Sequence, residues 1–195
     1  MITNLKNKLK FIELLDKMNE IKRVITLKNG DMESDAEHSF HLAMMVSVFL
    51  PDFPKLSELK TIKIALFHDL VEIFAWDTVL FDEEMTKTKK QREAKAVIEL
   101  EKVLWEKDFA DFKTLILEYE NKSSIEAEFV YELDKLQPII KIITEWWNDF
   151  HTLKMDKNKI MKDKLEKIGD KFWFRQILRK YEKIGDENNM FYFDK

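Results

Sequence analysis

The chain has 195 residues, of which 45% are hydrophobic, 12% are aromatic and 36% are charged, and its net charge is −4. This is the composition of a soluble globular protein long enough to fill one core, and it argues against a disordered chain. Because the 33 basic and 37 acidic residues are interspersed, they create no overall field that would attract nucleic acid or an anionic membrane.

The scarcity of turn-forming residues indicates an all-α fold. Three Gly and three Pro are too few for the turns of a sheet protein, and several stretches carry apolar residues at helical spacing. We expect a compact bundle of about seven to nine helices that forms a single domain over residues 1–195. Its motif-bearing core covers about 23–150, and an amphipathic C-terminal helix and tail cover about 157–195.

The first half of the chain contains three expected helices. They span about residues 4–20, 34–50 and 57–74. The second begins at Ser34, because Ser34 and Glu37 have the spacing of a capping box, and it stops before Pro51. The third is apolar nearly all round in its second half, which predicts a central, buried element.

The second half begins with residues 77–88, in which apolar residues do not recur at a regular helical spacing. Helices are then expected over about 86–107, 109–120, 125–150 and 158–184. Ser123 and Glu126 have the spacing of a second capping box. Pro138 falls inside the helix that follows, where it would clash with the carbonyl of Asp134 and angle that carboxylate inward.

Three ionisable residues interrupt the apolar third helix. They are His68, Asp69 and Glu72, in a run where packing alone would favour hydrocarbon. Burying such a group without a partner costs on the order of several kcal/mol. A shared partner is therefore expected, and a metal ion suits these side chains best.

Histidines supply further candidate ligands. The four in the chain are His38, His41, His68 and His151. Two imidazoles and two carboxylates from separate helices would suit Mn, Co, Fe, Zn, Ni or Mg, with open positions for water. Since Asp69 adjoins His68, the second carboxylate must come from elsewhere, and Asp134 is the candidate.

The same residues resemble a known family. His38, the pair His68 and Asp69, and the late Asp134 resemble the H…HD…D signature of HD-domain metal-dependent phosphohydrolases. More narrowly, the chain is similar to the small 5′-deoxyribonucleotidase branch, and the match runs from about residue 23 to residue 138. The similar segments are 36–39, 68–72 with 77–78, 90–94 and 129–135.

The resemblance implies a compact helical fold that holds one divalent cation. Its ligands would be His38, His68, Asp69 and Asp134. It also implies that a metal-bound water attacks the phosphorus of a nucleoside 5′-monophosphate, with the 2′-deoxy forms as one candidate substrate class.

Other positions match residues that have further roles in the family. Glu72 matches the catalytic carboxylate that transfers a proton, Asp77 matches the reader of the sugar hydroxyl, and Arg23 matches a phosphate contact. Trp76 stands where glycine is common, and Val24 stands where some members have a tryptophan associated with excluding the ribose 2′-hydroxyl. The choice between ribose and deoxyribose therefore stays open.

Simpler interpretations also stay open. Glu72 could form an ion pair with Arg23 or a lysine, and Asp77 could be a helix cap. His41 could pack beside the site, and His151 could be structural. The alternatives for the whole chain are an HD hydrolase of another phosphate ester or a nucleoside triphosphate, and a non-catalytic, metal-stabilised helical domain that binds a partner.

The expected setting is the cytoplasm. The chain lacks cysteine, which excludes disulfides and thiolate metal sites. Its N-terminus lacks the apolar segment of a signal peptide, and no stretch reaches the roughly 18 apolar residues that span a bilayer. The expected partner is a small nucleotide, with no nucleic acid and no membrane. The aromatic tail at 191–193 would pack on its own core or in a homodimer.

Overall fold

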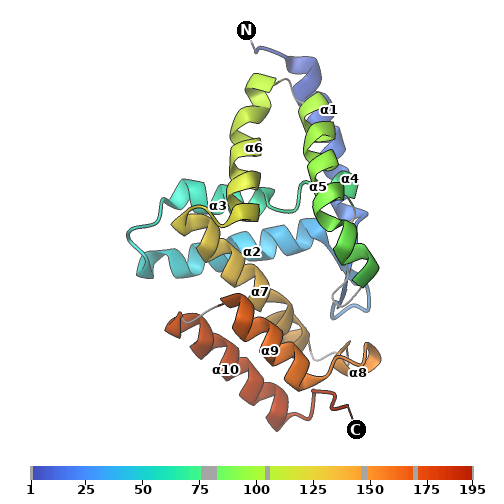
Figure 1. Cartoon of the computed structure of the whole chain (residues 1–195), viewed down its shortest axis with the longest axis vertical. Coiled ribbons are helices and arrows are strands. Elements are labelled where there is room, and N and C mark those ends of the chain that lie inside the picture. Colours follow the sequence, from blue (N-terminus) through green and yellow to red (C-terminus); the bar gives the residue numbers. More distant parts are fainter. Residues whose placement is uncertain (1, 76–82, 104–105, 146–148, 169–170, 195) are drawn as a thin grey trace. The chain divides into compact units, whose positions relative to one another are not determined.

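The structure, a computed structural model, describes residues 2–75, 83–103, 106–145, 149–168 and 171–194 (Figure 1). Within these ranges its regular elements are helices and one two-stranded sheet. Eight of the described α-helices have ten residues or more, and α4 and α8 are single turns of four residues. The all-α prediction is confirmed.

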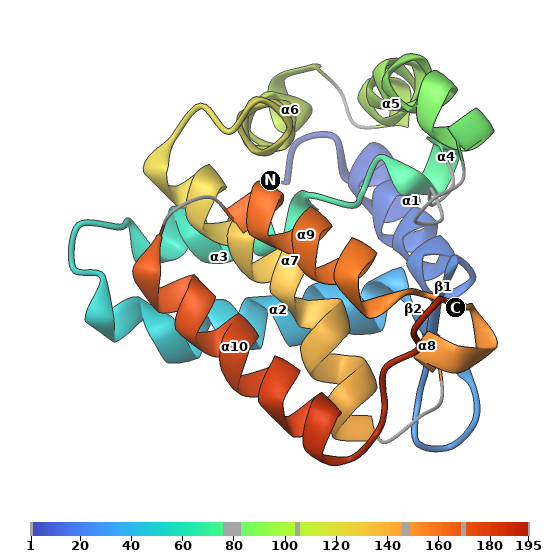
Figure 2. The same cartoon turned by 60° about the horizontal axis from the view of Figure 1, so that its bottom comes forward.

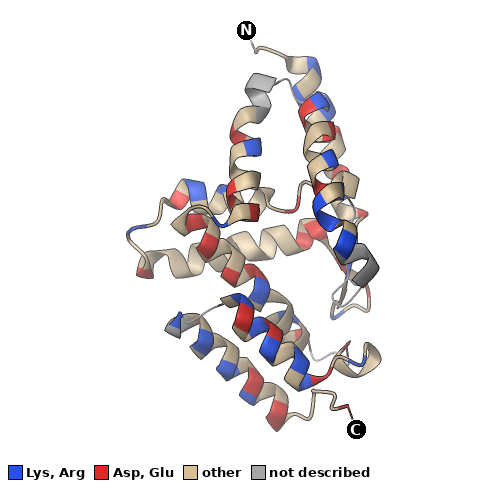
Figure 3. Ribbon diagram, viewed as in Figure 1, with Lys and Arg blue, Asp and Glu red and all other residues tan. Residues whose placement is uncertain are grey.

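The elements follow one another as shown in Figures 1 and 2. The α-helices are α1 (Leu5–Leu15), α2 (Asp35–Phe49), α3 (Glu58–Phe67), α4 (Glu72–Ala75), α5 (Glu83–Val103), α6 (Glu106–Asn121), α7 (Ile125–Glu145), α8 (Asp149–Thr152), α9 (Lys157–Ile168) and α10 (Phe172–Glu187). The 3₁₀ turns are η1 (Asp16–Asn19) and η2 (Leu50–Asp52), and the strands are β1 (Lys22–Thr26) and β2 (Met32–Ser34). Lys and Arg mix with Asp and Glu along α5, α9 and α10 (Figure 3).

The chain divides into two compact units. The first contains Met1–Val24 and Ser34–Glu128, and the second contains Ile25–Glu33 and Phe129–Lys195. The chain crosses from one unit to the other in the hairpin of β1 and β2 and again within α7.

Helix packing organises the first unit. Helices α2 and α3 pack together, α3 also contacts α6, and α4 packs on α5. The predicted capping box is confirmed, because the Ser34 side chain accepts a hydrogen bond from the Glu37 backbone while the Glu37 carboxylate accepts one from the Ser34 backbone. A buried apolar cluster fills the core of this unit. Its members are Phe11, Met18, Ile21, Leu70, Val71, Ile73, Ala75, Ala96, Leu100 and Ile116.

The predicted third helix is interrupted in its buried part. Helix α3 ends at Phe67, and α4 begins at Glu72. Between them the backbone makes tight i→i−3 hydrogen bonds, from Leu70 N to Phe67 O (3.1 Å) and from Glu72 N to Asp69 O (2.9 Å). Such bonds wind the chain more tightly than an α-helix does. The prediction of one continuous helix was therefore wrong here, and His68 and Asp69 lie in a turn.

Aromatic contacts hold the second unit together. The ring centroids of Phe129 and Phe174 lie 5.9 Å apart, and those of Phe150 and Phe191 lie 4.9 Å apart. Gly185 on α10 leaves room for the Phe191 ring, which a Cβ at that position would overlap. Of the two expectations for the tail, packing on its own core is confirmed for Phe191, which is buried.

Some helix boundaries in the second half differ from the predictions. The cap of α7 is Ser124, whose Oγ accepts from Ala127 N at 3.2 Å, and not Ser123. The expected helix over 158–184 is described as two helices, α9 and α10, because Lys171, the N-cap of α10, has an extended backbone that a continuous helix would not contain. The expected helix over 125–150 is described as α7 and α8, and Pro138 lies inside α7. None of the described helices is long and apolar enough to cross a membrane.

Candidate metal centre

The turn after α3 fixes the orientation of His68. The buried ring places Nδ1 2.9 Å from the carbonyl oxygen of Ala65. A carbonyl only accepts hydrogen bonds, so Nδ1 carries a proton, and Nε2 is the nitrogen that a neutral ring would offer as a metal ligand. That nitrogen lies 3.1 Å from Oδ2 of Asp69.

A second imidazole comes from α2. The capping box sets the start of this helix at Asp35 and places His38 at the end of its first turn, fully buried. Nε2 of His38 lies 3.7 Å from Oδ2 of Asp69, and the ring centroids of His38 and His68 are 5.4 Å apart. One carboxylate oxygen is therefore close to both imidazoles.

These three side chains form a cluster that suits a metal ion. One potential ligand atom from each of His38, His68 and Asp69 lies within 4.8 Å of the others. With Nδ1 of His68 donating to the backbone, its Nε2 and the Asp69 oxygen bring two lone pairs together, and a proton or a cation must offset their repulsion. Two nitrogens and a carboxylate are a common ligand set for divalent transition metals. The residues therefore fit a divalent cation.

Positive neighbours keep Asp69 ionised. Burial opposes the charged form, but His68, Arg23 and His38 together hold the pKa of this carboxyl well below its ordinary range. An ionised carboxylate is the form that coordinates a metal. The electrostatics of the cluster therefore favour the ligand state of Asp69.

Arg23 of β1 joins the cluster through Asp69. Its Nη1 donates to Oδ2 of Asp69 at 3.2 Å and to Oδ1 of Asp35 at 3.3 Å. The guanidinium is always charged, and Asp35 is fully buried at the first position of α2. The structure thus brings a predicted substrate residue to the candidate ligands.

Glu72 begins α4. Its carboxylate is buried, and its backbone N–H bonds the carbonyl oxygen of Asp69 at 2.9 Å. The tight turn keeps Glu72 in the interior of the same unit as His38, His68 and Asp69. Its role in proton transfer stays a prediction.

The remaining predicted site residues lie in the second unit or outside the described residues. Asp134 belongs to the second unit, where it is buried and its Oδ2 accepts a hydrogen bond from Nζ of Lys135 at 2.5 Å. Its role as a fourth ligand stays a prediction. Asp77 and Trp76 lie outside the described residues.

The other two histidines lie outside the cluster. His41 is partly exposed on α2. His151 is exposed on α8, and its ring centroid lies 6.0 Å from that of Tyr192.

Sequence reasoning missed two residues beside the cluster. Asp35 binds Arg23, and the ring of Tyr119 on α6 meets the His68 ring edge-on with centroids 4.9 Å apart. An acid in the first turn of a helix is common for electrostatic reasons alone, so Asp35 gave no separate signal. Nothing in the sequence around Tyr119 indicates that it packs on a histidine in another element.

Comparisons with known proteins agree with this geometry. A model of the HD domain family matches residues 15–177. The chain is 26% identical over 183 residues to the 5′-deoxynucleotidase HDDC2 of Mus musculus, covering 93% of this chain and 88% of the relative. It is 30% identical over 137 residues to the protein of the same name from Danio rerio, covering 69% and 68% of the two chains.

A solved structure is also similar over nearly the whole chain. It is the crystal structure of a predicted metal-dependent phosphohydrolase from Magnetospirillum magnetotacticum MS-1, with a TM-score of 0.81 and 28% identity. The similarity covers 97% of this chain and 96% of that one. The fold of this chain therefore also occurs in a protein described as a predicted metal-dependent phosphohydrolase.

Proposed function

Because the chain belongs to the HD domain family, we propose that it is a metal-dependent phosphohydrolase that removes the phosphate from nucleoside 5′-monophosphates. The observation that carries the proposal is the buried cluster of His38, His68 and Asp69. The relatives named 5′-deoxynucleotidase support nucleotide monophosphates as substrates, including the 2′-deoxy forms.

The proposed cofactor is one divalent cation, with Co, Mn, Mg, Fe, Ni and Zn as the candidates. His38, His68 and Asp69 would hold it, and Asp134 is the proposed fourth ligand. Such a cation lowers the pKa of a bound water and offsets the negative charge of phosphoryl oxygens. The Ala65 carbonyl supports the role of His68 as a metal ligand, because it binds Nδ1 and so keeps Nε2 available.

The chain's own residues would handle the phosphate and the proton. Arg23 already lies against Asp69, and a guanidinium binds phosphate oxygens through paired, charge-assisted hydrogen bonds. Glu72 would take a proton from the attacking water or give one to the leaving oxygen. Asp77 is proposed to bind the sugar, as its match to the family indicates.

An activity panel tests this proposal. Purified protein is incubated with ribo- and deoxyribonucleoside 5′-monophosphates and with Co, Mn or Mg, and orthophosphate is measured. We expect metal-dependent release that chelation abolishes, with equal amounts of nucleoside and orthophosphate. Failure to release phosphate from every monophosphate, although metal is bound, would refute the proposal. Pyrophosphate or triphosphate from nucleoside triphosphates would indicate a different HD hydrolase.

A homodimer is a further part of the proposal. Phe40, Met44 and Val48 form an apolar row at four-residue spacing on α2, with exposed fractions of 66%, 49% and 69%. An uncharged apolar row is complementary to a second copy of itself. Light scattering should give twice the chain mass, and Val48→Glu should give the chain mass. A monomeric wild-type protein would contradict the homodimer without affecting the proposed chemistry.

The cellular setting and domain organisation are also proposals. The absence of cysteine supports a cytoplasmic protein. The family match over residues 15–177 includes parts of both compact units, which supports one domain over the whole chain.

A further inference from the structure

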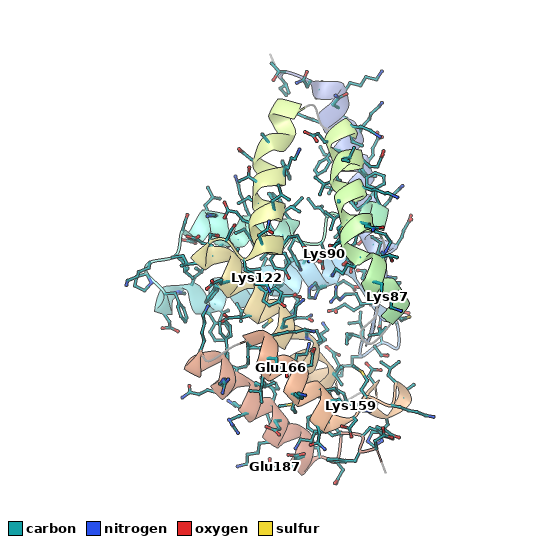
Figure 4. All side chains as sticks on the ribbon, viewed as in Figure 1. Lys87, Lys90, Lys122, Lys159, Glu166 and Glu187 are labelled. Atoms are coloured by element: carbon teal, nitrogen blue, oxygen red, sulfur yellow. The ribbon has the colours of Figure 1, made fainter. Side chains whose placement is uncertain are left out.

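Lys164 on α9 is a buried cation. Only 5% of its surface is exposed, whereas Lys159 and Glu166 on the same helix extend into solvent (Figure 4). Within the described parts of the chain, its ammonium forms neither a hydrogen bond nor an ion pair. Lysine is rarely buried without a partner.

The charges around Lys164 do not compensate it. Burial and the charges of Lys135 and Lys167 lower the pKa of Lys164 to about 7, while Asp163 and Asp134 act in the opposite direction. Both carboxylates are already engaged, since Lys167 lies 2.8 Å from Asp163 and Lys135 lies 2.5 Å from Asp134. When all five of these side chains are ionised, they carry one more positive charge than negative charges.

Such an arrangement disfavours folding. An uncompensated buried charge is strongly destabilising, and methionine could fill the same space without a charge. A structural lysine would be expected to have an acidic partner of its own. The missing charge is therefore expected to come from a ligand, and it must be negative.

We propose that Lys164 binds the phosphate group of the nucleotide substrate. This inference rests on the proposed function, in which Asp134 is a metal ligand. The charge of Asp134 raises the pKa of Lys164, so the two side chains interact electrostatically. A phosphate monoester carries up to two negative charges and three acceptor oxygens, and an ammonium offers three donors on a flexible stem. Binding would supply the anion that Lys164 lacks and would place the phosphate beside the proposed metal ligand.

The test compares Lys164→Met with the wild-type protein, both metal-loaded. Calorimetric titration with inorganic phosphate should show affinity reduced by roughly 10- to 100-fold, the loss expected for one charge-assisted hydrogen bond. KM for nucleoside monophosphates should rise by a similar factor. Thermal unfolding should shift upward in the variant, because a buried charge is removed. A lysine with only a structural role would give the opposite shift and unchanged phosphate binding.

Two further variants complete the design. Lys162→Met removes a lysine from the same helix that is 78% exposed, and we expect it to change phosphate affinity by less than about twofold. If Lys164→Met fails to fold, Lys164→Gln replaces it in the same titration.

The outcomes separate this inference from the proposed function. Unchanged phosphate affinity and KM in a folded Lys164 variant, with an active wild-type protein, would overturn the inference alone. Wild-type protein that hydrolyses no monophosphate would refute the proposed function. The phosphate titration would then still decide whether Lys164 binds the anion.

Discussion

The Ala65 carbonyl gives the His68 ring a defined tautomer. Because Nδ1 holds a proton and bonds the carbonyl, the ring can bind a metal only through Nε2. Replacing His68 with alanine should therefore weaken metal binding by at least about 100-fold. Removing a residue that only orients a metal ligand typically costs about 10- to 100-fold, so the loss of a ligand should reach at least the upper end of that range. Titration with Mn or Zn measures this. His151→Ala, at an exposed histidine outside the cluster, is the control and should bind metal as the wild type does.

Glu72 is buried near the proposed ligands, and its carboxylate can be replaced by an amide of nearly equal size. Glu72→Gln should lower kcat for phosphate release by roughly 10² to 10⁴, the usual contribution of a positioned acid or base. Metal content, measured on the same sample, should stay at the wild-type level. A decrease smaller than about tenfold would leave Glu72 with a structural role, such as an ion pair.

Lys164 should make stability depend on pH. Its pKa is lowered to about 7 in the folded chain, against an ordinary value of 10.5. Between these values the unfolded chain binds the extra proton, so folding is penalised fully below about pH 7 and the penalty disappears as the pH rises toward 10.5. The full penalty is on the order of 5 kcal/mol.

Denaturant unfolding of the wild type and of Lys164→Met checks this. The variant should be the more stable protein by the largest margin near about pH 6, and the margin should shrink toward about pH 10. A margin that does not vary over this interval would show that Lys164 does not titrate there. The comparison with a variant cancels the titration of other groups that the two proteins share.

At the scale of the element, the capping box of α2 connects local sequence to the metal cluster. Ser34 is buried, and its backbone N–H lies 2.8 Å from the Glu37 carboxylate. Ser34→Ala should reduce the free energy of unfolding by about 1 kcal/mol, within the usual range of about 0.5 to 2 for a lost cap. Because His38 lies in the first turn of that helix, metal affinity should fall as well.

Ser47→Ala is the matched control for this prediction. Ser47 is exposed on the same helix, and its hydroxyl only bonds the Ala43 carbonyl one turn earlier. We expect its free energy of unfolding to change by less than about 0.5 kcal/mol, with metal affinity unchanged. Equal losses in the two variants would mean that the cap has no special role.

The sequence predicted the start of a helix from a local motif, but it did not predict where helices are interrupted. The start of α2 follows from two residues three positions apart, and the structure confirms it. The turn at His68 was not predictable, because a buried run is apolar whether its hydrogen bonds are i→i−3 or i→i−4. The break after α9 was missed because one glycine is often tolerated within a helix.

The same contrast holds at the candidate metal centre. His38, His68 and Asp69 were predicted from residue type and order, and the structure brings their potential ligand atoms together. Asp35 and Lys164 were not predicted. Asp35 is significant because it is buried and binds Arg23 in another element, and Lys164 because it is buried without a described partner. A sequence pattern contains neither kind of information.

For the whole molecule, the decisive question is whether Asp134 is the fourth protein ligand of the cation. Asp134 lies on α7, far along the chain from His38, His68 and Asp69, and in the proposed site all four side chains bind the metal. Asp134→Asn should then weaken metal binding by at least about tenfold. Asp163→Asn, also in the second unit but on α9, should not.

Thermal unfolding gives an independent measure of the contribution of Asp134 to metal binding. A ligand at 100 times its dissociation constant stabilises a folded protein by about 2.7 kcal/mol. Saturating metal should therefore raise the melting temperature of the wild type, and chelation should reverse the change. In Asp134→Asn the increase should be markedly smaller at the same metal concentration. An equal increase in both proteins would show that Asp134 is not a ligand of the cation.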